Sequence, residues 1–191
     1  MTMKLDERFG QIATEHKASI KRRCARITLG SSVVRVFEKN TKVDLLVALN
    51  GIPVGQLLHL RTPTSFQKWF KDKLGVVAGV IQKRNHGNGR LGKGLKWGHA
   101  SKVLCLFLRE LVECSHYFAD DEARRIAELL YVPIDSVIIG RLREDEVPLT
   151  FDRIRGIGTE KAFFDVQKEL GKAAHKTGVS RIWYDDAWAA R

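Results

Sequence analysis

Apolar residues recur every three or four positions over much of this chain, and no other feature of the sequence constrains the fold as strongly. One run contains Phe66, Trp69, Phe70, Leu74, Val77 and Ile81. A second contains Val103, Leu104, Phe107, Leu108, Leu111 and Val112. Residues at this spacing share one face of an α-helix, and that face is stabilised when it packs against other helices. We therefore expect a mainly α-helical protein.

Four further segments carry helical signals. The first runs from Leu5 to Ile27 and has a basic side, and the last runs from about Glu160 to Lys176. Between them, the acids that open "DDEARRIAELL" suit the first turn of a short helix, where they complement the helix dipole. Another short helix is expected from Asp135 to Leu142, after Pro133. Together with the two long runs, these segments predict a helical bundle.

Residues 32 to 60 have a different character. The stretches "SVVRVFE", "VDLLVAL" and "IPVGQLLHL" are rich in β-branched and apolar residues, and Asn50-Gly51 separates the last two. Asn-Gly between such runs is a strong signal for a β-hairpin. We expect a small antiparallel β meander of three strands near the N-terminus. It would divide the chain into a helix-plus-meander subdomain, residues 1–62, and a helical catalytic region, residues 63–191.

The composition is that of a globular protein, with 44% hydrophobic and 29% charged residues in a chain of 191. No run of about 18 apolar residues indicates a membrane span. The N-terminus lacks the apolar stretch of a secretion signal. Neither the three cysteines nor His86, His99 and His116 have the spacing of metal ligands. We expect a cytoplasmic monomer that has no membrane contact, no metal and no cofactor.

The strongest global signal is the net charge of +11, which arises from 33 Lys and Arg against 22 acids. Such an excess attracts polyanions. DNA is the partner that we favour. An acidic protein or a membrane surface is the second choice, and a basic enzyme without a polyanionic partner is the third.

The segment "KRNHGNGRLGKGLKW", residues 83 to 97, combines glycines with basic residues and should form a loop. A loop of this composition suits the DNA backbone, because each Lys or Arg can neutralise a phosphate. The alternative is a simple surface turn. The candidate phosphate contacts here are Lys83, Arg84, Arg90, Lys93 and Lys96.

Two polar residues, Lys102 and Asp135, stand near the starts of apolar helices, in "KWGHASKVLCLFL" and "VPIDSVIIGRL". A neutral lysine amine is a nucleophile, and a carboxylate beside it can accept its proton or stabilise positive charge on a substrate. Each residue also has a simpler interpretation. Asp135 or Ser136 could only cap its helix, and Lys102 could be a solvated surface lysine. Taken together on a basic chain, the two residues predict a catalytic pair.

This arrangement resembles the helix-hairpin-helix DNA glycosylase superfamily. The resemblance covers residues 84–143 and rests on a basic glycine-containing turn, a helix that opens with "GHASKV", and the "VPID" segment that opens another helix. It is closest to the archaeal type of the 8-oxoguanine branch, because 33 residues separate Lys102 from Asp135 and "DDEARRIAELL" would be the extra helix between them. The resemblance implies a glycosylase-like helical bundle.

The resemblance also implies roles for individual residues. Lys102 would be the Schiff-base nucleophile and Asp135 its catalytic carboxylate, with a possible β-lyase step. Gly98 and His99 would belong to the hairpin that grips DNA. Trp97 could pack either against an extruded base or against the core.

The implied activity is excision of an oxidised purine such as 8-oxoguanine by base flipping. An alkylated base, or a hypermodified phage base removed in antiphage defence, is an alternative substrate. A non-catalytic basic DNA-binding module and an adaptor for an acidic protein are alternative functions.

The hairpin departs from the family pattern, which has two closely spaced glycines before the lysine. Here Gly98 alone stands close to Lys102, and His99 occupies a position where a small residue is usual. A second glycine turn, "RIRGIGTEKAFF" at 153–164, copies the pattern better but follows Asp135 instead of preceding it. This turn could hold a phosphate at a helix start or be a simple turn with Thr159 as N-cap.

Overall fold

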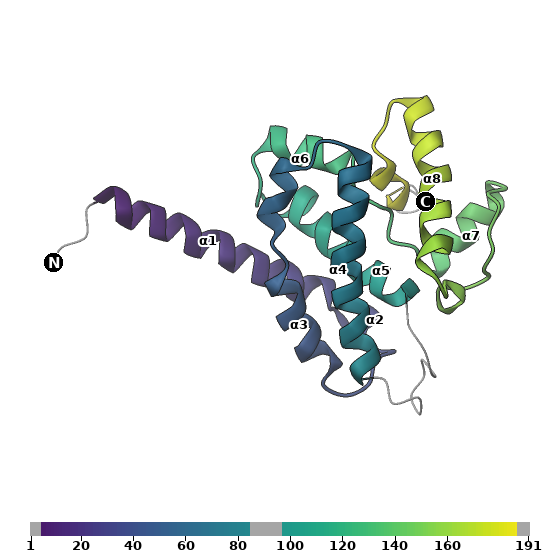
Figure 1. Ribbon diagram of the computed structural model, residues 1–191, viewed down its shortest axis with the longest axis horizontal. Coiled ribbons are helices and arrows are strands. Elements are labelled where there is room, and N and C mark those ends of the chain that lie inside the picture. Colours follow the sequence, from purple (N-terminus) through teal and green to yellow (C-terminus); the bar gives the residue numbers. More distant parts are fainter. Residues whose placement is uncertain (1–4, 85–96, 187–191) are drawn as a thin grey trace.

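The computed structural model describes residues 5–84 and 97–186, and these fold into helices joined by short connections (Figure 1). The protein is therefore mainly α-helical, as the apolar periodicity predicts. In the following list, η marks 3₁₀-helices, except that η2 is a π-helix. The elements are α1 (Leu5–Thr28), α2 (Ser31–Val34), α3 (Thr41–Gly51), η1 (Val54–His59), α4 (Pro63–Arg84), α5 (Trp97–Arg109), η2 (Glu110–Cys114), α6 (Asp120–Ala127), α7 (Ser136–Glu144), η3 (Ile154–Gly156), α8 (Glu160–Thr177) and η4 (Arg181–Asp185).

The expected β meander is wrong, because residues 32–60, all of which the structure describes, contain no strand. Instead they form α3 and η1, with most of α2 before them. Leu45 and Leu49 are fully buried, whereas Val47 between them is 70% exposed. Burial at every fourth residue is the pattern of a helix, since a strand would bury every second residue. Asn50-Gly51 ends α3 and makes no hairpin.

One hydrophobic core includes residues from both of the expected parts, 1–62 and 63–191. An aromatic cluster lies within it and links α4, the segment before α7, and α8. The rings of Phe70 and Phe163 stack with centroids 5.8 Å apart. Tyr131 meets Phe70 edge-on at 4.8 Å and Phe163 edge-on at 5.7 Å. These contacts hold the beginning of α7 and the beginning of α8 against the same helix.

None of the residues that the structure describes forms a strand beside the segment between α6 and α7, and two long side chains take up its backbone polar groups. Gln167 of α8 accepts from Val132 N at 3.0 Å and donates to Val132 O at 2.8 Å. Arg181 of η4 donates to Leu130 O at 3.0 Å and to Leu129 O at 2.9 Å. Burial lowers the pKa of Arg181. Because buried backbone groups need partners, these contacts determine where α7 can begin.

Helix α1 projects from the body as an arm, on the side away from α7 and α8 (Figure 1). Its C-terminal half is anchored, because Ile20 and Cys24 are buried in the core. Lys21 Nζ donates to Asn50 O at 2.6 Å and to Ile52 O at 2.5 Å. Burial lowers the pKa of Lys21. The anchor therefore joins α1 to the C-terminal end of α3, where unpaired carbonyls need donors.

The N-terminal half of α1 has no such anchor. Leu5, Phe9 and Ile12 are 68%, 62% and 51% exposed, and in the C-terminal half Ile27 is 53% exposed. The helix expected from Leu5 to Ile27 forms, but most of the apolar face read from its sequence is not covered by the body. We use the name arm for residues 5–16 of α1 below.

Candidate active site

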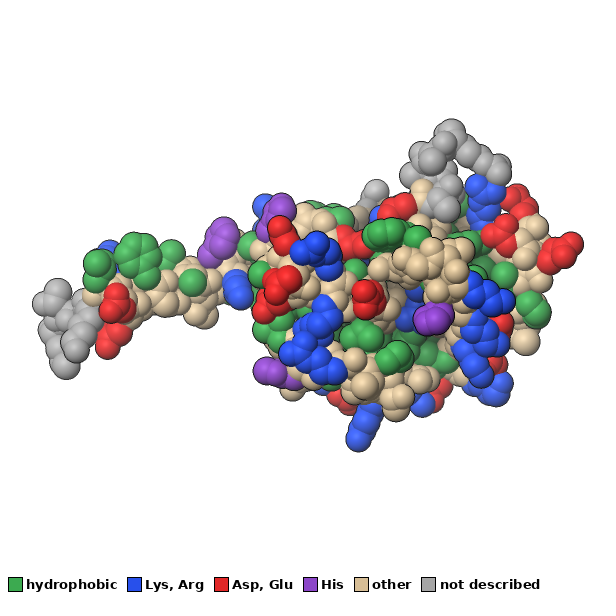
Figure 2. Space-filling view, turned by 90° about the horizontal axis from the view of Figure 1, so that it is seen from above, with side chains coloured by type: hydrophobic (Ala, Val, Ile, Leu, Met, Phe, Trp, Pro, Cys, Tyr) green, Lys and Arg blue, Asp and Glu red, His purple; other side chains and the backbone are tan. Residues whose placement is uncertain are grey.

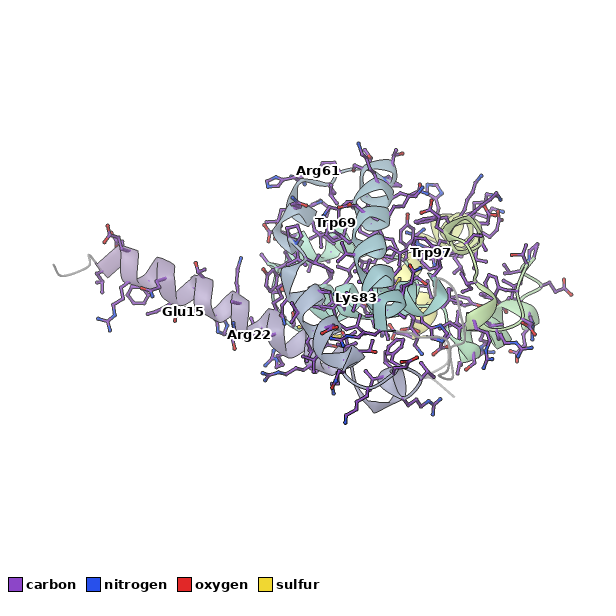
Figure 3. The ribbon with its side chains drawn as sticks, turned by 60° about the horizontal axis from the view of Figure 1, so that its bottom comes forward. Glu15, Arg22, Arg61, Trp69, Lys83 and Trp97 are labelled. Carbon is purple, nitrogen blue, oxygen red and sulfur yellow. The ribbon has the colours of Figure 1, made fainter. Side chains whose placement is uncertain are left out.

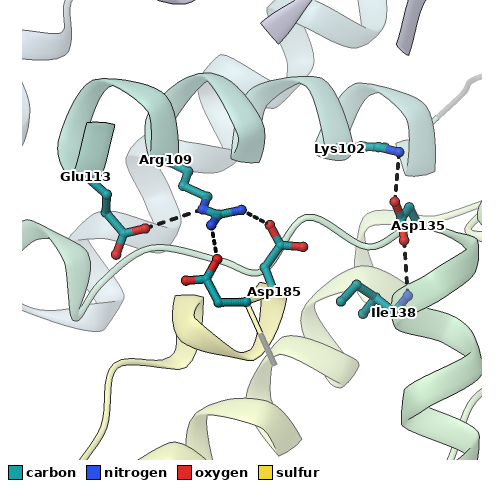
Figure 4. A network of polar contacts seen from close by, with 7 residues as sticks. Lys102, Arg109, Glu113, Asp135, Ile138 and Asp185 are labelled. Carbon is teal, nitrogen blue, oxygen red and sulfur yellow. Dashed lines mark hydrogen bonds and ion pairs between the residues drawn. The ribbon is translucent and has the colours of Figure 1, made fainter. Parts of the chain in front are cut away.

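Lys102 and Asp135 lie side by side, although 33 residues separate them in the chain (Figure 4). Lys102 Nζ donates to Asp135 Oδ2 at 3.0 Å. Their side chains are 22% and 28% exposed. The ion pair is therefore partly shielded from water but still accessible from solvent.

Asp135 divides its two carboxylate oxygens between two tasks. It is the N-cap of α7, where Oδ1 accepts from Val137 N at 2.9 Å and from Ile138 N at 3.1 Å. Oδ2 faces Lys102. The capping interpretation is therefore correct, and it leaves one oxygen for another partner. The two backbone bonds fix the orientation of that oxygen.

The first turn of α5, which precedes Lys102, is supported by the glycine turn at 153–164. Gly98 N donates to Ile157 O at 3.2 Å. A Cβ at Gly98 would stand 2.1 Å from Ile154 O and 3.1 Å from Ile157 Cβ. No side chain fits in that space, so glycine is required here for close backbone packing. Thr159 caps α8 by accepting from Ala162 N at 3.2 Å.

Two residues expected to bind DNA, Gly98 and His99, lie inside the protein. Gly98 is covered by η3, as described above. His99 is 8% exposed, and its ring meets Phe37 edge-on with centroids 6.2 Å apart. Because both residues are covered, the structure lends no support to their expected role in DNA binding, which stays a prediction. The start of a helix is a good phosphate site only where no other part of the fold covers it.

The other expected DNA contacts lie at the end of α4 and the start of α5. Lys83 is exposed in the last turn of α4, and Trp97, the first residue of α5, is partly buried against the core (Figure 3). Arg84 forms an ion pair with Asp44 of α3. The hydrogen bond from Arg84 lowers the pKa of Asp44. Three remaining candidates lie outside the described residues: Arg90, Lys93 and Lys96.

A second group of charges, which the sequence did not reveal, lies beside the pair (Figure 4). Arg109, the last residue of α5, forms ion pairs with Glu113, Asp185 and Asp186. Burial raises the pKa of Asp185 to about 6, with the Arg109 charge opposing the rise and the Asp135 carboxylate adding to it. The carboxylates of Asp135 and Asp185 are therefore close enough to influence each other, and Asp185 shares the single Arg109 charge with Glu113 and Asp186.

Sequence reasoning missed Arg109 and Asp185 for understandable reasons. Arg109 ends an apolar helical run, where an arginine is ordinary. Asp185 belongs to the aromatic tail "RIWYDDAW", in which the pair of adjacent acids is a weak signal. Their proximity to Lys102 and Asp135 is a tertiary contact.

Across residues 5–84 and 97–186, no group of three or more His, Cys, Asp or Glu residues is arranged to hold a metal ion. Nor is any helix in these two ranges long and apolar enough to cross a bilayer. Comparison of the chain with protein-family models, with curated proteins and with solved structures found no match. The function proposed below therefore rests on the geometry of the site and on the charge of the chain.

Proposed function

We propose that this protein is a DNA glycosylase that excises a modified base with Lys102 as nucleophile and Asp135 as catalytic carboxylate. The observation that carries the proposal is the ion pair in which Lys102 Nζ lies 3.0 Å from Asp135 Oδ2. A nucleophile and its base must be within hydrogen-bonding distance, and this pair meets that requirement. Both side chains are partly exposed and can be reached from solvent.

The proposed reaction begins when Asp135 Oδ2 accepts a proton from Lys102 Nζ. The amine then attacks C1′ of the nucleotide, the bond from C1′ to the base nitrogen breaks, and its electron pair leaves with the base. The base takes up a proton from water, and the hydroxide that remains removes one proton from the nitrogen now bonded to C1′. The sugar ring then opens as the C1′–O4′ bond breaks, O4′ takes up the proton held by Asp135, and a protonated Schiff base forms between Lys102 and C1′. Loss of a C2′ proton with cleavage of the C3′–O bond would then nick the strand.

One feature of the chain supports DNA as the substrate, because the net charge of +11 favours a polyanion. The lysine must also reach the sugar of a nucleotide that has left the base stack, and the fixed orientation of Asp135 favours attack by placing the proton acceptor in advance. By its resemblance to the 8-oxoguanine branch we assign an oxidised purine as the first substrate to test, with a hypermodified phage base as the alternative.

The test is borohydride trapping on a panel of oligonucleotides that carry oxidised, alkylated or hypermodified bases. Borohydride reduces a Schiff base to a stable covalent adduct between protein and DNA. We expect an adduct with the wild type and none with Lys102→Gln. Lys172→Gln is the matched control, because Lys172 also pairs with a carboxylate, Glu169 at 2.7 Å, but lies on the surface of α8.

An adduct that persists undiminished in Lys102→Gln would refute the assignment of the nucleophile. Alkali treatment of parallel reactions without borohydride reads abasic sites directly. Salt-dependent DNA binding with no abasic site on any substrate would favour a non-catalytic DNA-binding module instead.

A further inference from the structure

The arm has an uncovered apolar face that the proposed function does not use. Leu5, Phe9 and Ile12 are spaced by four and three residues, so they share one side of α1, and each is more than half exposed. Figure 2 shows hydrophobic side chains gathered on the projecting arm. Clustered exposed apolar side chains of this size mark a contact surface, whereas isolated ones need no explanation.

The spacing of this face is that of a coiled-coil seam. In heptad terms, Leu5 and Ile12 occupy d positions, and Phe9 and His16 occupy a positions. Arg8 and Glu15 both fall at the g position, on the same edge of the seam and one heptad apart. The seam therefore has one basic and one acidic residue on a single edge.

Both of these charged residues have capacity for a further partner. Arg8 forms no ion pair with any part of the chain that the structure describes. Glu15 accepts a hydrogen bond at 2.9 Å from the neutral amide of Gln11. Figure 3 places Glu15 on the arm, away from the body. Within residues 5–84 and 97–186, neither residue has a partner of opposite charge, so this edge is free to pair with charges on another molecule.

We propose that the arms of two copies of this chain pair antiparallel about a two-fold axis. Antiparallel pairing sets each a position opposite a d position, so Phe9 packs on Ile12 of the second copy, and Leu5 packs on His16. The same register places Arg8 opposite Glu15 of the second copy, and the two-fold axis forms this ion pair twice. A parallel pair would lack this match, because identical residues would then lie side by side.

The charges of the arm also distinguish a second copy from a lipid surface. A helix that lies on an anionic membrane is usually rich in Lys and Arg on its polar face. The tip of this arm instead carries Asp6 and Glu7, which an anionic surface repels. Pairing of two helices is stabilised by contacts between opposite charges, and this arm carries both a basic and an acidic residue at its edge.

The seam is short, since 12 residues of helix extend about 18 Å. Such an interface lies at the small end of specific contacts, so we expect a reversible dimer with a dissociation constant on the order of micromolar. This proposal replaces the monomer expected from the sequence. Because the arm projects away from α7 and α8 (Figure 1), pairing leaves the Lys102 and Asp135 site of each copy uncovered.

The first experiment is sedimentation velocity of the full chain from about 1 to 100 μM, a range that brackets a micromolar dissociation constant. The wild type should shift from monomer to dimer, and the double variant Phe9→Ser and Ile12→Ser should stay monomeric. Val43→Ser and Val47→Ser is the matched control, because these residues form an exposed apolar pair on α3, 58% and 70% exposed. Circular dichroism of each variant checks that the helices are retained.

The second experiment exchanges the charges. Arg8→Glu or Glu15→Arg alone creates two like-charge contacts and should weaken the dimer about three- to tenfold at low salt. The double variant Arg8→Glu and Glu15→Arg restores both ion pairs and should return the dissociation constant to near that of the wild type.

Three results would overturn the proposal. They are a monomer over the whole concentration range, a double charge exchange that is weaker than either single change, and binding to anionic vesicles by a protein that stays monomeric in solution. None of these measurements depends on glycosylase activity.

Discussion

Lys102 engages one carboxylate oxygen of Asp135, at 3.0 Å, and leaves the other oxygen to the backbone of α7. The two tasks of this carboxylate can be separated by substitution, because capping requires only an acceptor whereas pairing with an ammonium requires a negative charge.

Asp135→Asn is expected to keep the fold and lose the activity. Asn caps helices about as well as Asp, so the free energy of unfolding should change by less than about 1 kcal/mol. The amide cannot accept a proton from Lys102, so base release should fall on the order of 100-fold or more. Urea denaturation and a base-release assay measure the two effects. If Asp135→Asn retained full base release, the role of Asp135 would be limited to capping α7.

Gly98→Ala is expected to destabilise the protein by about 2 kcal/mol or more, because the new Cβ would collide with backbone. The collision is with Ile154 O, 2.1 Å from the Cβ position. Gly75→Ala in α4 is the control, since its Cβ would meet nothing within 4 Å. That change should stabilise the helix by up to about 1 kcal/mol. Thermal or urea denaturation compares them, and equal effects of the two substitutions would contradict the close packing of η3 on α5.

Gln167→Leu is expected to cost about 2–4 kcal/mol of unfolding free energy, because it leaves both backbone groups of buried Val132 without a partner. Since the segment that these bonds hold leads into Asp135, the variant should also lose base release at temperatures where it is still folded. Gln82→Leu, at an exposed position of α4, should change stability by less than about 0.5 kcal/mol. A Gln167→Leu protein as stable as the wild type would show that water or another group can replace the glutamine.

Asp185 should make the fold less stable as pH rises towards neutrality. Its pKa is raised from 3.8 to about 6 in the folded state, chiefly by burial. Between these values the folded protein binds the proton more tightly than the unfolded chain does. Ionisation therefore costs stability as pH rises through this window, and acidification removes the cost.

The measurement is urea denaturation of the wild type and of Asp185→Asn at about pH 4 and pH 7. The wild type should lose stability relative to the variant by on the order of 1–2 kcal/mol at the higher pH. A relative gain at pH 7 would mean that Arg109 dominates over burial and holds the pKa of Asp185 low.

The sequence predicted α4 and α8 well because their large apolar residues recur with the helical period and are in fact buried, as Phe70 and Phe163 illustrate. It failed between residues 32 and 60. There the β-branched residues suggested strands, but Val43 and Val47 point to solvent and the buried positions Leu45 and Leu49 follow a helical spacing. In such cases the pattern of buried residues decides the secondary structure, and the β propensity of single residues does not.

The candidate site was predictable only where both partners had a recognisable local pattern. Lys102 and Asp135 each stand near the start of an apolar helix, and the order of the two patterns pointed to the pair. Arg109 and Asp185 lie 76 residues apart and have no comparable pattern. The burial of Gly98 was equally hidden, since it depends on η3, which comes more than fifty residues later in the chain, and His99 lies against Phe37, far earlier in the chain.

The hydrogen bond from Gly98 N to Ile157 O also limits the order in which parts of the chain can fold during synthesis. The acceptor is made 59 residues after the donor. At ordinary translation rates this delay is about 3–12 s. During that interval Lys102 and Asp135 have both been synthesised, but the first turn of α5 still lacks its covering segment. The turn before Lys102 therefore cannot close until Ile157 has been synthesised.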